Sequence, residues 1–320
     1  MRQLQDLRDY GGLTLGFVRR YPLRAFLLLI IALAIIYFYG WLRLYGNDPM
    51  SIWHWAWARF LPQYNQEHSK IIPFVVLFLA WYHRDGLRSA PKQGNNLGLI
   101  FVAIAVLCYV AAARVVQPRV ALFGLPLLLF GIVLFLWGKQ VARILLFPCL
   151  LLFFLIPLGA IEQTTFRLQF LIIGVVKVLS RICGIGIQTI GTSIHSTSAN
   201  WGFDIAEGCS GIRSLIAMIM LTALYVHFYQ RVWWKKVVIL AASVLFAIAG
   251  NAGRIFTIIV LARLGFPKFA GGIYHDWSSQ LIFFPIALLT MLAFARLLSI
   301  GQDTETKPLG RKVEQEPISA

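Results

Sequence analysis

A cysteine flanked by small residues is the first feature of this chain that could do chemistry. Cys209 lies in the run EGCSG at residues 207–211, where a polar stretch gives way to an apolar one. A thiol at a helix start lies near the partial positive charge of unpaired backbone N–H groups. That environment favours the thiolate, which is the form that attacks carbonyl carbons. Cysteines of membrane helices are more often packing residues, so Cys209 needs partners before it indicates catalysis.

Two side chains further along the chain have the chemistry that such a thiol needs. The imidazole of His275 could take the thiol proton and return it to a leaving amine. The guanidinium of Arg254 could stabilise the thiolate or the oxyanion of a tetrahedral intermediate. Arg213 competes with Arg254 as the thiolate's partner, and His195 competes with His275 as the base. Singly, each residue is typical of a membrane interface; together they indicate acyl transfer, provided that the fold brings them together.

The composition decides the class of protein. Of 320 residues 59% are hydrophobic and 13% are charged, and the mean hydropathy is +0.73. Such a chain is a polytopic membrane protein. Although the net charge is +16, lysine and arginine gather in short loops, where they set topology, and nucleic-acid binding is not expected. The four cysteines have neither metal-type nor disulfide-type spacing, so no cofactor or metal is expected.

Charge-free apolar stretches predict an all-α fold of about eight transmembrane helices within residues 1–300, followed by a polar cytoplasmic tail, 301–320. The stretches are 25–42, 71–82, 97–113, 120–138, 144–161, 214–230, 237–253 and 277–295. The second is shorter than the about 17 residues that a span needs. The loop charges place both termini in the cytoplasm.

The segment 164–187 is apolar but carries Arg167, Lys177 and Arg181 on one side of a predicted helix. An amphipathic basic helix lies in the membrane interface, so we expect it to lie flat on the outer face, with a full crossing as the alternative. The polar stretch 191–203 then forms an outer loop leading to Cys209. Residues 254–275 are too few and too interrupted by glycine and proline to cross and return. Cys209, Arg254 and His275 are therefore expected at one outer mouth, within residues 200–280.

Several motifs together resemble the exosortase/archaeosortase family of membrane transpeptidases, and the histidine resembles its bacterial exosortase branch. The motifs are EHSK at 67–70, FFLIPL at 153–158, GCSGIRSL at 208–215, NAGRI at 251–255, and His275. The resemblance implies that Cys209 is the nucleophile and that Arg254 and His275 are its partners. Lys70 departs from the family pattern, and we assign no site role to His68.

The resemblance also implies the substrates and the location. Family members cleave exported proteins that end in a Pro-Glu-Pro-like motif, a membrane helix and a basic tail (a PEP-CTERM-like signal). The cleaved protein passes through a thioester to an acceptor nucleophile that the sequence does not identify. The enzyme would lie in the inner membrane, surrounded by the lipid bilayer, with its active site on the extracytoplasmic side. The alternative is a non-enzymatic transporter or assembly subunit whose outer basic groups bind an anionic exopolymer.

Overall fold

The computed structural model describes residues 22–43, 45, 49–61, 66–157, 160–204 and 211–300. Cys209 and the predicted tail, 301–320, lie outside the described residues. The described chain divides into two compact units, which we describe separately. Residues 22–60 and 69–157 belong to the first unit, and residues 61–68 and 160–300 to the second.

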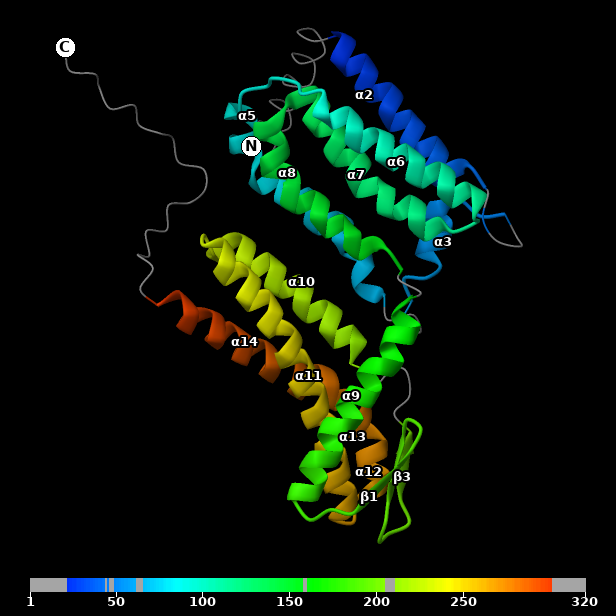
Figure 1. The fold of residues 1–320 in the computed structure, drawn as a ribbon, viewed down its shortest axis with the longest axis vertical. Coiled ribbons are helices and arrows are strands. Elements are labelled where there is room, and N and C mark those ends of the chain that lie inside the picture. The colour runs from blue at the N-terminus through cyan, green and yellow to red at the C-terminus, as the bar shows by residue number, and fades with distance from the viewer. Residues whose placement is uncertain are drawn as a thin grey trace, which may run out of the picture. The chain divides into compact units, whose positions relative to one another are not determined.

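The first unit consists of helices (Figure 1). They are α2 (Pro22–Ile35), η1 (Ile36–Trp41), α3 (Ile52–Trp57), α4 (Ile72–Tyr82), α5 (Arg84–Ser89), α6 (Leu97–Arg114), α7 (Pro118–Trp137), α8 (Lys139–Leu151) and η4 (Leu152–Leu155). The short 3-10 helix η3 (Glu67–Lys70) lies where the sequence passes between the units. Glycines bring α6 and α7 together: a Cβ atom on Gly98 would lie 2.4 Å from the carbonyl oxygen of Gly131. Small residues allow this close backbone approach between membrane helices.

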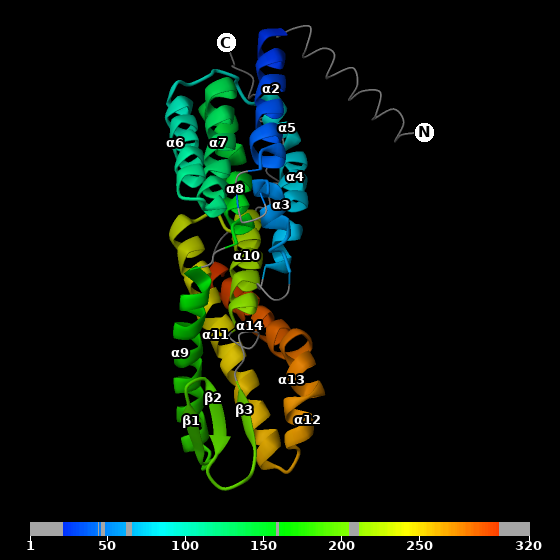
Figure 2. The ribbon, with the colours of Figure 1, turned by 90° about the vertical axis from the view of Figure 1, so that its right-hand side faces the viewer.

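The second unit combines long helices with a small sheet. Its elements are α9 (Ala160–Ile182), β1 (Ile187–Ile190), β2 (Ser193–Ser196), β3 (Gly202–Asp204), α10 (Ile212–Tyr229), α11 (Trp233–Arg263), α12 (Pro267–Gly271), α13 (Ile273–Ser278), η6 (Ser279–Phe283) and α14 (Phe284–Ser299). The three strands pair antiparallel in the order β1-β2-β3. Figure 2 shows the sheet beside the far end of α11, close to α9 and α12.

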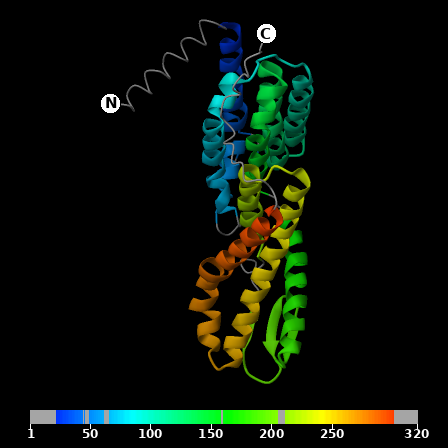
Figure 3. The same cartoon turned by 90° about the vertical axis from the view of Figure 1, so that its left-hand side faces the viewer.

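Helix α11 is shared by two separate hydrophobic cores. Its first part packs with α10 and α14 around Met218, Ile239 and Met291 (Figure 3). Its last part packs with α9, the sheet and α12, and there the core contains Ile172, Trp201 and other apolar residues. The remaining members of this second core on α11 are Ala252, Ile255, Ile258, Ile259 and Ala262. The two cores follow one another along a single helix.

Five helices are long and apolar enough to cross a membrane: Leu97–Arg114, Pro118–Trp137, Ile212–Tyr229, Trp233–Arg263 and Ile273–Ser299. They match five of the predicted spans, and they make this a multi-pass membrane protein. The apolar helices Phe26–Trp41 and His68–Tyr82 are shorter. In the described part of the stretch predicted at 144–161, the chain forms the end of α8, the short 3-10 helix η4 and the first residues of α9. A total of eight spans stays a prediction.

Two sequence expectations were wrong. The fold is not all-α, because the expected outer loop at 191–203 contributes β2 and part of β3 to the sheet. The helix predicted to stop at Gly253 continues to Arg263 and ends where Gly265 takes a φ of +96° and Pro267 follows. The reason is tertiary: the residues after Arg254 bury an apolar face, and each isoleucine buried there stabilises the helix by about 1.5–3 kcal/mol.

Segment 164–187 was expected to be helical, and it is helical as far as Ile182, where α9 ends. Its last residue, Ile187, is the first residue of β1. Its buried face, around Ile172 and Val176, packs into the second core, and its basic side chains Arg167, Lys177 and Arg181 are exposed. The amphipathic character is therefore observed, whereas its orientation in the membrane stays a prediction.

Candidate active site

A cavity of about 410 Å³ opens in the second unit, beside the point on α11 where one core gives way to the other. One face of each of three helical segments lines it, at the i, i+3 or i+4 spacing of a helix. From α10 and the residue before it come Gly211, Arg213, Ser214 and Ala217; from α11 come Asn251 and Arg254; from α13 to α14 come His275, Asp276, Ser279, Gln280 and Phe284. The structure thus brings Arg213, Arg254 and His275 to one cavity.

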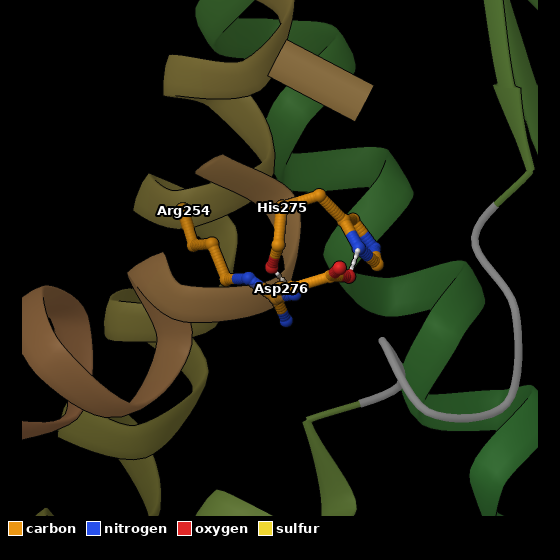
Figure 4. A network of polar contacts seen from close by, with 3 residues as sticks. All are labelled: Arg254, His275 and Asp276. Carbon is orange, nitrogen blue, oxygen red and sulfur yellow. Dashed lines mark hydrogen bonds and ion pairs between the residues drawn. The ribbon is translucent and has the colours of Figure 1, made fainter. Parts of the chain in front are cut away.

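Arg254 joins α11 to α13. Its side chain is only 4% exposed, and Nη2 donates a hydrogen bond of 2.6 Å to the carbonyl oxygen of His275 (Figure 4). A second link runs nearby, where the hydroxyl of Tyr274 donates to Thr257 Oγ1 at 2.8 Å. The Thr257 hydroxyl in turn donates to the Arg254 carbonyl oxygen. Arg254 thus holds the backbone of His275 and is itself part of the cavity lining.

The imidazole of His275 is held by its sequence neighbour. Nδ1 lies 3.1 Å from Oδ1 of Asp276, and the side chains are 31% and 71% exposed, respectively. Figure 4 shows the ring and the carboxylate facing one another, on the other side of the His275 backbone from the Arg254 contact. The histidine is therefore held at two points, by its carbonyl and by its ring.

The chain enters α10 through a glycine that no other residue could replace without strain. Gly211 has a φ of +75°, in the left-handed region, and a Cβ atom there would lie 2.6 Å from Nδ2 of Asn251. Asn251 itself is buried on α11, one turn before Arg254. The Ser214 hydroxyl donates to the Gly211 carbonyl oxygen at 2.8 Å and closes the first turn of α10. Both the backbone conformation and the close approach to Asn251 thus require glycine here.

Other residues weighed in the sequence lie elsewhere. His195 is on β2, where its ring lies over Gly202, and it is not among the described residues that line the cavity. His227 is in the last turn of α10, at the end opposite Arg213. Cys183 is exposed just after α9. A larger cavity, of about 980 Å³, lies in the first unit and contains none of the predicted site residues.

Two of the residues that line the cavity without a site role assigned from the sequence are Asn251 and Asp276. Asn251 stands three residues before Arg254, and this helical spacing was the signal that both share one face. Asp276 adjoins His275, but adjacency alone does not predict that a carboxylate turns towards the ring. Among the described residues, no group of three or more histidine, cysteine, aspartate or glutamate side chains could hold a metal ion.

A comparison with known protein families matches most of this chain. The family described as "Transmembrane exosortase (Exosortase_EpsH)" matches residues 57–293, which is more than half of the chain and includes every residue lining the cavity. Searches of curated proteins and of solved structures found no match. The match, over the helices that build the second unit and most of the first, shows that this chain belongs to the transmembrane exosortase family.

Proposed function

We propose that the cavity of the second unit is the active site of a membrane-embedded cysteine protease–transpeptidase that cleaves the C-terminal sorting signals of exported proteins. Family membership supports a membrane transpeptidase that acts on sorting signals. The observation that carries the assignment of the site is the contact between Arg254 and His275 in a cavity that Gly211 also lines. Gly211 stands two residues after Cys209. Two trans peptide units span at most about 7 Å, so chain connectivity keeps the Cα atom of Cys209 within that distance of Gly211.

In the proposed reaction the sulfur of Cys209 attacks the scissile carbonyl carbon, and the thiol proton passes to His275. The tetrahedral intermediate collapses as the C–N bond breaks, and the leaving amine takes the proton from His275. The membrane helix and basic tail of the substrate depart with that amine. The N-terminal part stays on Cys209 as a thioester until an acceptor nucleophile attacks it, giving up its own proton and regenerating the thiol.

Two guanidinium groups line the cavity and can stabilise the negative charge that develops in this reaction. Arg254 is buried and already donates one hydrogen bond to the protein, so its position is fixed before substrate arrives. Arg213 is half-buried in the first turn of α10 and lines the same cavity. Fixed donors near a developing oxyanion are worth roughly 10²–10³-fold in turnover. We assign the oxyanion to Arg254 and a supporting role at the thiolate to Arg213.

The length of α11 supports a site at the membrane surface. Its 31 residues extend about 46 Å, whereas the hydrocarbon core of a bilayer is about 30 Å thick. If Trp233 begins the crossing, Arg254 lies about 32 Å further along the helix and reaches the opposite surface. The second core then stands outside the membrane. With the cytoplasmic termini proposed from the loop charges, this surface is the extracytoplasmic side of the inner membrane.

Replacement of the thiol tests the proposal. Cys209→Ala should abolish cleavage of a protein bearing a motif–helix–basic-tail signal, while the variant still inserts into membranes. Cys183→Ala is the matched control, because Cys183 is a free, exposed thiol near the same unit's sheet and should be silent. Cleavage is measured by gel shift of the substrate in membranes containing equal amounts of each variant.

Wild-type cleavage by Cys209→Ala would overturn the enzymatic function. It would favour the alternative, a transporter or assembly subunit whose basic groups bind an anionic exopolymer. A thiol-alkylating reagent gives an independent measurement: it should stop cleavage in Cys183→Ala membranes, where Cys209 is intact, whereas a transporter's activity should not depend on Cys209.

A further inference from the structure

The contact between His275 and Asp276 determines more than the position of the ring. The carboxylate of Asp276 is 71% exposed, and its Oδ1 faces Nδ1 of the His275 ring. An ionised carboxylate only accepts hydrogen bonds. Nδ1 of His275, 3.1 Å from Oδ1, must therefore be the donor in this contact. In the neutral imidazole the other nitrogen, Nε2, is then the one without a proton.

We propose that Asp276 is a positioning residue for the reaction at this site: it accepts the Nδ1–H of His275 and leaves Nε2 as the nitrogen that exchanges protons with thiol and leaving amine. The inference rests on the proposed function. The proton balance is unchanged, because the thiol proton moves to Nε2 and from there to the amine, while Asp276 gains and loses none.

The placement of Asp276 supports this role over a purely structural one. It lines the cavity with His275, and its exposed side chain contributes little to a buried core. The position of the backbone at His275 is already fixed by Arg254, so Asp276 is not needed to hold α13 on α11. What Arg254 does not fix is the rotation and tautomer of the ring, and Asp276 is hydrogen-bonded to that ring.

The exposure of Asp276 sets the size of the expected effect. Loss of a buried aspartate from a protease triad lowers turnover by about 10⁴-fold. Because Asp276 is exposed, a water molecule can accept the hydrogen bond of Nδ1 when the carboxylate is removed. We therefore expect a smaller loss of turnover here. We expect turnover of Asp276 variants to fall by about 10-fold to 10²-fold, with the KM for substrate unchanged.

A set of three substitutions separates positioning from shape and from charge. Asp276→Asn keeps the shape, but its amide can donate to Nδ1 and favour the tautomer that carries its proton on Nε2. Asp276→Ala removes the contact, so neither tautomer nor rotation of the His275 ring is favoured by residue 276. Asp276→Glu keeps a carboxylate acceptor. The expected order of turnover is therefore Glu above Ala, with Asn no better than Ala. Asp85→Asn is the matched control, since Asp85 is an exposed aspartate in the first turn of α5, in the other unit.

The measurement is cleavage rate against substrate concentration in membranes with equal amounts of each variant. Asp276→Asn at the wild-type rate, or clearly faster than Asp276→Ala, would overturn the inference, because a shape-only role predicts that order. A raised KM with normal turnover would also overturn it and would indicate that the carboxylate binds the substrate. Wild-type activity in Cys209→Ala marks a different failure, that of the proposed function itself.

Discussion

Substituting Gly211 by alanine adds one methyl group at the entrance to α10 and tests whether the cavity is the reaction site. Gly211 lines the cavity, and it is the described residue nearest in sequence to Cys209. Its φ of +75° costs an L-residue about 1–2 kcal/mol. The new methyl carbon would also lie 2.6 Å from Nδ2 and 2.8 Å from Cγ of Asn251, well inside an ordinary contact of about 3.5–4 Å.

The two effects have different consequences. Strain in the backbone lowers stability but leaves the site's geometry intact, whereas the clash must move either Asn251 or the start of α10 by about 1 Å. Asn251 is buried on a long helix that is packed on both sides, so we expect α10 and the segment before it to move. A misplacement of about 1 Å can lower turnover by about 10²-fold. We expect a loss of that size in Gly211→Ala.

Gly184→Ala isolates the strain from the clash. Gly184 has a comparable φ of +68°, but no atom lies within 4 Å of the position that a methyl group would take there. The substitution should cost similar stability and leave cleavage unchanged. The assay compares substrate cleavage per inserted molecule for both variants, with thermal aggregation in detergent reporting stability. Equal cleavage by Gly211→Ala and wild type would refute the location of the site, and equal loss in both variants would show that strain alone is responsible.

Two further predictions concern the arginine and the topology. Arg254→Lys keeps the charge but loses the planar group of donors that reaches the His275 carbonyl oxygen, so turnover should fall by about 10²-fold or more. The measurement is cleavage kinetics in membranes. Wild-type kinetics would contradict both roles of Arg254, the hydrogen bond to His275 and the stabilisation of the oxyanion. A reporter fused after residue 301 should report a cytoplasmic C-terminus, and an exterior signal would remove the even number of spans that places Cys209 outside.

The sequence determined, for a direct physical reason, that this is a mostly helical protein with several membrane-spanning helices. Apolar stretches without charge have one stable environment, the bilayer, and five of them became helices long enough to cross it. The grouping of Arg254 and His275 followed from chain length, because 20 intervening residues broken by glycine and proline leave no room to cross and return. In the structure the two residues are in contact, through a hydrogen bond from Arg254 to the carbonyl oxygen of His275.

Only the tertiary structure decided where α11 ends and what covers its last part. Arg254 interrupts an apolar run, and in one dimension an interruption is typical of the end of a span. In three dimensions the helix continues, because Ile255, Ile258 and Ile259 meet α9 and a sheet drawn from a distant stretch of chain. The strands themselves are short and mostly polar, so their pairing depends on neighbours that local pattern does not predict.

The same distinction applies within the site. Residue types and spacing selected Arg213, Arg254 and His275, since the chemistry of a side chain belongs to the sequence. The sequence alone does not determine the tautomer of His275. The tautomer depends on the orientation of the Asp276 carboxylate, and Arg254 holds the backbone that positions both side chains. The type of a side chain is given by the sequence. Its orientation depends on contacts with several elements, and these contacts form only in the folded protein.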